Sequence, residues 1–198
     1  NIIIYNSVVG ARSLVGNAKT TLLADNNIGI VRSIVGSFSL KQDAITTLIA
    51  KNTALINRSI LAAVALDSGI AANAVIGENI LINRSILAAV AEDGLALNLI
   101  LGENLLLNRS ILAAVVLDNG AAINAVIARN ALINRSILAA YAQNGIAANG
   151  IVSENLVLNR SIMAAVVEDG IAANIILAKN ALINRSILAA VALDSGIA

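Results

Sequence analysis

The side chains of this 198-residue chain that could take part in chemistry are arginine, carboxylate, serine and asparagine, because histidine and cysteine are absent. The chain therefore lacks the commonest general base, the thiol nucleophile and most metal ligands other than carboxylates. Its acids are widely spaced and sit mainly beside turn glycines, which is typical of turns. We expect no enzyme activity, no cofactor and no metal site, calcium included.

The triplet Asn-Arg-Ser recurs along the chain at a nearly constant spacing, first at Asn57 and last at Asn184. Its arginines are Arg58, Arg84, Arg109, Arg135, Arg160 and Arg185. Stacked like charges repel unless they are solvated or paired, so we expect carboxylates such as Glu78, Glu103 and Glu154 close by. We interpret the arginines as a solvated charged edge, with contact to a glycan or polyanion as the alternative. The triplet also meets the N-glycosylation consensus.

Two further kinds of residue keep the same period. A glycine follows an acidic or amide turn and is expected to supply a positive φ at Gly69, Gly94, Gly120, Gly145, Gly170 and Gly196. One row of asparagines ends a polar corner at Asn79, Asn104, Asn130, Asn155 and Asn180, and another lies within apolar segments at Asn73, Asn98, Asn124, Asn149 and Asn174. Each repeat therefore has three polar corners.

The apolar segments between corners have the lengths of strands, as in Ile86 to Ala91 and Leu95 to Leu101. In the second segment, leucines alternate with Ala96, Asn98 and Ile100, which is the period of a strand with two apolar faces. We predict an all-β fold, a β-solenoid of about 25-residue coils whose asparagines stack into amide ladders. An α-helical hairpin repeat solenoid is the alternative, favoured by the high alanine content.

The repeats divide the chain into two parts. Residues 57–198 form regular repeats, and residues 183–198 duplicate 56–71, so the last repeat is incomplete and a longer chain or a next subunit is expected to complete it. Residues 1–56 are a diverged version that could act as a cap. There, we interpret Arg32 as the counterpart of Arg58 one repeat earlier, and Arg12 as the counterpart of Arg32.

Composition narrows the choice of partners. Hydrophobic residues make up 58% of the chain, but polar residues interrupt every apolar run, so no membrane span is expected. A net charge of +1 predicts no broad attraction for nucleic acid or anionic lipid. Both faces of the strands are apolar, which favours lateral association with other copies.

Over residues 31–198 the repeat resembles the curlin repeat of curli amyloid subunits. One repeat of this chain has its polar and glycine residues in that family's order: Asn83-Arg84-Ser85, Gly94, Asn98 and Asn104. The chain departs from the family in its inserted arginine, its longer glycine arch, and asparagine or apolar residues where the family favours glutamine. The resemblance implies an exported β-solenoid subunit that polymerises end to end into an extracellular matrix fibre.

We therefore expect a structural filament subunit whose partner is itself, located outside the cell or at its surface. The alternative is a monomeric repeat rod that acts as an adhesin or glycan-binding module.

Overall fold

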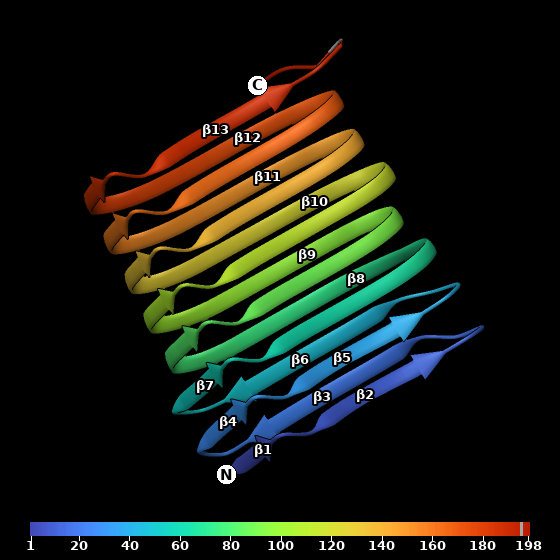
Figure 1. Cartoon of the computed structure of the whole chain (residues 1–198), viewed down its shortest axis with the longest axis vertical. Helices are drawn as coiled ribbons and strands as arrows, with labels where there is room; N and C mark the ends of the chain where they lie inside the picture. The colour runs from blue at the N-terminus through green and yellow to red at the C-terminus, as the bar shows by residue number, and fades with distance from the viewer. Residues whose placement is uncertain (195) are drawn as a thin grey trace.

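The computed structural model describes residues 1–194 and 196–198, so Ser195 of the last turn lies outside the described residues. The described part is a single 13-stranded parallel solenoid (Figure 1). Its strands are β1 (Ile2–Tyr5), β2 (Val8–Ser13), β3 (Ala18–Ala24), β4 (Asn27–Val31), β5 (Ile34–Ser39), β6 (Ala44–Ala50), β7 (Thr53–Asn57), β8 (Ile60–Asn83), β9 (Ile86–Asn108), β10 (Ile111–Asn134), β11 (Ile137–Asn159), β12 (Ile162–Asn184) and β13 (Ile187–Ala192).

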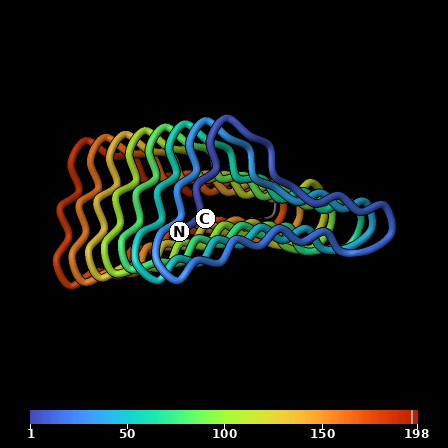
Figure 2. The backbone as a smooth tube through the Cα atoms, turned by 90° about the horizontal axis from the view of Figure 1, so that it is seen from below, coloured from blue at the N-terminus to red at the C-terminus, as the bar shows by residue number. Residues whose placement is uncertain are grey.

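Each long strand from β8 to β12 is almost a complete coil with three straight legs. In β9 the first leg is 86–91, the second is 95–101 and the third is 104–108. The glycine arch at 92–94 joins the first two legs, an amide corner at 102–104 leads into the third, and Arg109-Ser110 turns the chain into the next coil. Figure 2 shows the coil as a wedge, with the arches at its narrow end and the third legs across its broad end.

Successive coils stack in register through parallel pairing. β10 pairs with both β9 and β11, and Asn124 lies opposite Asn98 on one side and Asn149 on the other. The extra residue of the longer coils is absorbed at the arch, where the register shifts between Val116 and Gly120. The predicted all-β solenoid with stacked like residues is therefore confirmed, and the α-helical alternative is excluded.

The interior has two zones, and their residue sizes produce the wedge. Small residues such as Ala89, Ala91 and Ala96 are fully buried at the narrow end, where the first and second legs approach closely. Larger residues such as Leu87 and Ile100 fill the broad end. The leucines of the second leg face outward instead, so the outer surface between the corners is also apolar.

Residues 1–56 form coils of the same solenoid, because β1, β2 and β3 pair with β4, β5 and β6. The equivalence of Arg12 with Arg32 is wrong. Arg12 lies opposite Phe38 within the first legs, and its guanidinium stands 5.5 Å from the centre of that ring. The true counterpart of the Asn-Arg-Ser bend is Asn6-Ser7, where the N–H of Ser7 donates to Ser33 Oγ over 3.1 Å. A capping role for these coils stays a prediction.

Candidate functional site

A ladder of asparagine amides runs through the interior along the second legs. Asn98 Nδ2 donates to Asn124 Oδ1 in the next coil over 2.9 Å, and also crosses the interior to the carbonyl oxygen of Ala113 over 2.8 Å. The same pair of bonds repeats along this inner ladder, which contains Asn73, Asn98, Asn124, Asn149 and Asn174. The first four side chains are fully buried. The inner ladder therefore ties the first and second legs together as well as one coil to the next.

Threonines occupy the same column in the first coils. Thr46 Oγ1 donates across the interior to the carbonyl of Ala62 over 3.2 Å, and Thr20 does the same with Gly36 over 2.7 Å. A threonine cannot continue an amide ladder, and Asn73 Oδ1 is left buried without a hydrogen-bond partner. The hydrogen bond that crosses the interior is therefore present from the first coil, whereas the amide ladder starts only at Asn73.

Two further amide ladders run along the outside of the third legs. The ladder at the amide corner was predicted for Asn79, Asn104, Asn130, Asn155 and Asn180, and Asn104 Nδ2 donates to Asn79 Oδ1 over 2.9 Å. It also continues into the first coils, where Asn79 donates to Asn52 over 3.4 Å and Asn52 to Asn26 over 3.3 Å. The other was not predicted from the sequence and is formed by the asparagines of Asn-Arg-Ser: Asn57, Asn83, Asn108, Asn134, Asn159 and Asn184. Outer donors point toward the preceding coil, whereas inner donors point toward the following one.

The Asn-Arg-Ser triplet is a tight bend whose serine is buried. Ser110 is 1% exposed, and its Oγ accepts the N–H of Ser85 in the preceding coil over 3.2 Å while donating to the carbonyl of Asn108 over 3.0 Å. The asparagine amide is already held in its ladder. Both side chains that glycosylation of the consensus would involve are therefore occupied within the fold.

The arginine of each triplet lies at the corner, with its side chain exposed and its backbone in the left-handed region. The φ value of Arg109 is 52°, and the other arginines have values of 50–52°. Together they form the arginine edge: Arg32, Arg58, Arg84, Arg109, Arg135, Arg160 and Arg185. Left-handed backbone is unfavourable for a residue with a Cβ, and glycine or asparagine would adopt it more easily.

The expected neutralisation of these arginines by Glu78, Glu103 and Glu154 is wrong. Glu103 pairs with Arg129 at 3.5 Å, and the third leg separates it from Arg109. Within residues 1–194 and 196–198, no member of the arginine edge takes part in an ion pair. The guanidinium groups therefore lack internal partners.

The amide corner carries its own balanced column of charge, formed by Asp25, Lys51, Glu78, Glu103, Arg129, Glu154 and Lys179. Lys51 lies 3.3 Å from Asp25, and Lys179 lies 3.1 Å from Glu154. The hydrogen bond from Lys179 lowers the pKa of Glu154 below its ordinary value. The basic residues that interrupt the acids at this corner are therefore their partners.

The narrow end of the wedge is acidic. The acidic arch edge contains Asp43, Asp67, Glu92, Asp93, Asp118, Glu168, Asp169 and Asp194, with Lys41 the single basic residue in the described arches. The hydroxyl of Tyr141 donates a hydrogen bond to Glu168 Oε1 over 2.8 Å, and this bond raises the pKa of Tyr141.

The arch glycines do not all adopt the expected backbone. Gly94, Gly120, Gly145 and Gly170 have φ between 109° and 149°. In the arches that contain Gly69 and Gly196, a positive φ is found instead at Asp67 (67°) and Asp194 (52°). Glycine is still required in the column, because a Cβ on Gly120 would overlap the carbonyl oxygen of Gly94.

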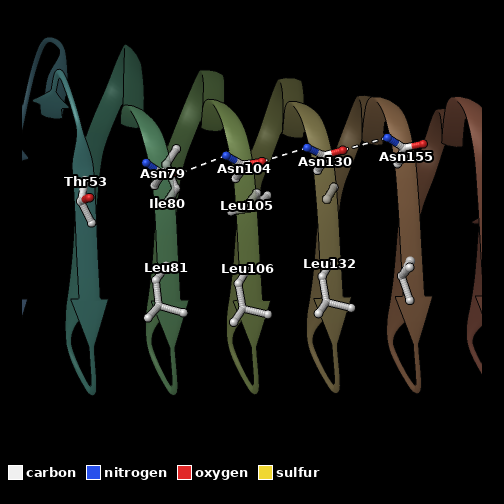
Figure 3. A pocket seen from close by; sticks show the side chains of 12 residues that line it. Thr53, Asn79, Ile80, Leu81, Asn104, Leu105, Leu106, Asn130, Leu132 and Asn155 are labelled. Carbon is white, nitrogen blue, oxygen red and sulfur yellow. Dashed lines mark hydrogen bonds between the residues drawn. The ribbon is translucent and has the colours of Figure 1, made fainter.

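A shallow apolar groove of about 350 Å³ lies on the broad face. Figure 3 shows Leu81, Leu106 and Leu132 in one row beside the amide ladder of Asn79, Asn104, Asn130 and Asn155. The row continues between the two outer ladders toward Leu182. These side chains offer apolar contact and amide hydrogen bonds, and no group suited to acid–base chemistry.

No cluster of metal-ligating side chains occurs in the part of the chain that the structure describes. That part also contains no helix long and apolar enough to cross a membrane. No protein-family model, curated protein or solved structure matches the chain. The likeness to curlin repeats therefore rests on its sequence motifs.

Proposed function

We propose that the chain is a structural subunit of an extracellular filament, in which copies stack end to end through the contacts that join its own coils. The observation that supports this most directly is that one coil's contacts with the next repeat along the chain. The same register pairs Asn98 with Asn124 and Asn124 with Asn149, with like side chains facing each other. A surface that fits its own translated copy is suited to unlimited addition.

The free energy for stacking would come from backbone hydrogen bonds and from the two core zones. The last described coil indicates how much core a coil leaves open when nothing stacks on it. Leu188 is 44% exposed, whereas its equivalents Leu138 and Met163 are fully buried. Covering such side chains is favourable by about 25 cal/mol for each Å² of apolar surface removed from water.

The extracellular location is a proposal based on the curlin resemblance, and a role without enzyme activity is proposed from the side chains available. An adhesin or glycan-binding rod is the second candidate, favoured by arginines that have no ion-pair partner among the residues that the structure describes. Loss of glycan binding in an Arg109→Ala, Arg135→Ala variant whose assembly persisted would favour that candidate.

Electron microscopy and X-ray fibre diffraction of the purified chain test the filament. We expect unbranched fibrils with a repeat of about 4.8 Å along their axis. A monodisperse monomer at high concentration, with no fibrils, would contradict the proposal.

A backbone variant sharpens this test. Ile187 and Leu193 donate their N–H groups to the preceding coil, so the N–H of Ala190, an odd number of residues from both, points the other way. Ala190→Pro removes a donor from the open side and is expected to slow elongation strongly, because proline is tolerated at a sheet edge but cannot pair there. Ala190→Ser keeps the N–H and a small side chain, as at Ser37 in the same column, and serves as the control. Equal elongation of the two variants would argue against addition at this edge.

A further inference from the structure

The net charge of the chain is close to zero, but the fold has two edges of opposite charge. The arginine edge holds seven arginines and no carboxylate, and the acidic arch edge holds eight carboxylates and one lysine. The balanced column at the amide corner accounts for most of the remaining charge. The arginines repeat at the coil spacing of about 4.8 Å, and most of the carboxylates lie one coil or less from the next, so most neighbouring charges on each edge lie within the Debye length of about 8 Å at physiological salt. Each edge therefore acts as a line of charge.

The arginine side chains are not required by the coil that carries them. Their backbone conformation suits glycine or asparagine better, and the first coil has Asn6 at this bend with a φ of 47°. The exposed guanidinium groups have no internal ion-pair partner among the described residues. Arginine nevertheless stands at each later bend, which indicates that its side chain acts outside the coil.

The two edges match each other in charge and in spacing. The arginine edge is built from one position in successive coils, and the arches carry one or two carboxylates each except in the first coil and in β11, which has Gln143 and Asn144 there. A second copy with its axis parallel to the first would therefore present carboxylates at multiples of the spacing between the guanidinium groups. The first leg lies between the two edges, and its outer side chains are apolar and partly exposed, as at Ile60 (37%) and Ile86 (37%). A net charge near zero leaves little overall repulsion between copies.

We propose that copies associate side by side, with the arginine edge of one solenoid lying along the acidic arch edge of another. The contact joins two different surfaces, so each copy keeps one free edge of each sign and the association can continue into a row. The inference concerns lateral contact and goes beyond end-to-end stacking. Short rods that never elongate are sufficient to test it.

Sedimentation velocity of the soluble chain at low and high salt gives the first test. We expect lateral oligomers at about 50 mM NaCl and their loss near 1 M, where the Debye length falls to about 3 Å. Replacing all seven arginines of the arginine edge with asparagine should abolish the oligomers while keeping the β circular dichroism spectrum. The control is Glu103→Gln, Arg129→Gln, Glu154→Gln, Lys179→Gln, which removes charges of both signs from the balanced corner and should still associate.

Cross-linking gives a direct test of which edges meet, because the chain has no native cysteine. One protein carries Arg109→Cys and another carries Asp118→Cys. Oxidation of the mixture should give mostly the mixed dimer, several-fold above either homodimer. With Glu103→Cys in place of Asp118→Cys, the excess should disappear.

Three results would overturn the proposal. One is lateral association that survives the arginine replacements, and another is an equal yield of mixed and homodimeric cross-links. The third is a chain that stays single at low salt but loses binding to a sulfated polysaccharide when the arginines are replaced, which would make the arginine edge a polyanion site. If electron microscopy showed no fibrils, the proposed end-to-end filament would be wrong, but sedimentation and cross-linking would still test lateral association.

Discussion

The inner and outer amide ladders should differ sharply in what they contribute to stability, and one coil contains a matched pair of residues. Asn124 belongs to the inner ladder and is fully buried, whereas Asn130 belongs to the outer ladder at the amide corner and is exposed. Each donates to and accepts from an asparagine in a neighbouring coil over 2.8–2.9 Å. Replacing each by alanine compares the same side chain in the two settings.

The expected magnitudes follow from what each replacement leaves behind. Asn124→Ala removes three hydrogen bonds and leaves Asn149 Oδ1 buried without the amide it accepts from. A buried acceptor left unpaired costs about 1–3 kcal/mol, and each further bond contributes about 0.5–1.5 kcal/mol, so we expect a loss of about 2–6 kcal/mol. Water can replace both bonds of Asn130, so Asn130→Ala should lose less than about 1 kcal/mol.

Urea denaturation followed by circular dichroism measures both free energies of unfolding. Amide hydrogen exchange in the flanking coils then reports whether the damage is local, since repeat arrays need not unfold in one step. If Asn124→Ala is no more destabilising than Asn130→Ala, the inner ladder does not anchor the two legs to each other.

Three other predictions concern the arch, the start of the inner ladder and the amide corner. Gly120→Ala should destabilise by about 2 kcal/mol or more in urea denaturation, because it combines positive φ with a clash against a neighbouring carbonyl. Ser37→Ala with Thr20→Asn and Thr46→Asn extends the ladder to the first coil, where water can reach the last acceptor, and should raise stability by about 1 kcal/mol by giving the buried Asn73 Oδ1 a donor. The lowered pKa of Glu154 means that its contact with Lys179 stabilises the fold above about pH 4.5 and is lost as pH falls through the lowered pKa, so Lys179→Gln should remove this part of the acid sensitivity of the urea midpoint.

The first two of these predictions have a control in the same chain. A Cβ on Gly150 would meet no atom within 4 Å, so Gly150→Ala should be nearly neutral. Thr47→Asn changes the neighbouring, partly exposed position and should add no stability. Equal effects of Gly120→Ala and Gly150→Ala would contradict the reasoning on the arch, and an equal gain from Thr47→Asn would contradict the reasoning on the ladder. An unchanged pH profile in Lys179→Gln would contradict the role of the ion pair.

The sequence predicts the stacking well because the coil period brings like residues together at every step. It does not predict which face of the second leg points inward, since leucines such as Leu97 and Leu99 alternate with Ala96 and Asn98 and either set could have been buried. Burial of the smaller set becomes clear only when the narrow end of the wedge is seen, where large side chains have no room.

The charged residues of the candidate site were harder to place, because nearness in sequence is misleading in a coil. Glu103 closely precedes Arg109 in the chain, but a straight third leg lies between them and spans about 17 Å at 3.3–3.4 Å per residue. Its partner, Arg129, lies one coil further along the chain. Comparing residues at coil spacing would have paired these side chains and revealed the third amide ladder.

The opposed donor directions of the amide ladders affect the dipole of the whole rod. In the inner ladder the side-chain amides point toward the following coil, as from Asn98 to Asn124, while the two outer ladders point the other way, as from Asn104 to Asn79. Along the rod axis the backbone N–H and C=O groups of successive residues point in opposite directions, so the sheets contribute little net axial dipole. Opposed ladders partly cancel, so the axial dipole grows more slowly with length than it would if all three were aligned, and lengthening the stack adds little electrostatic strain at its ends.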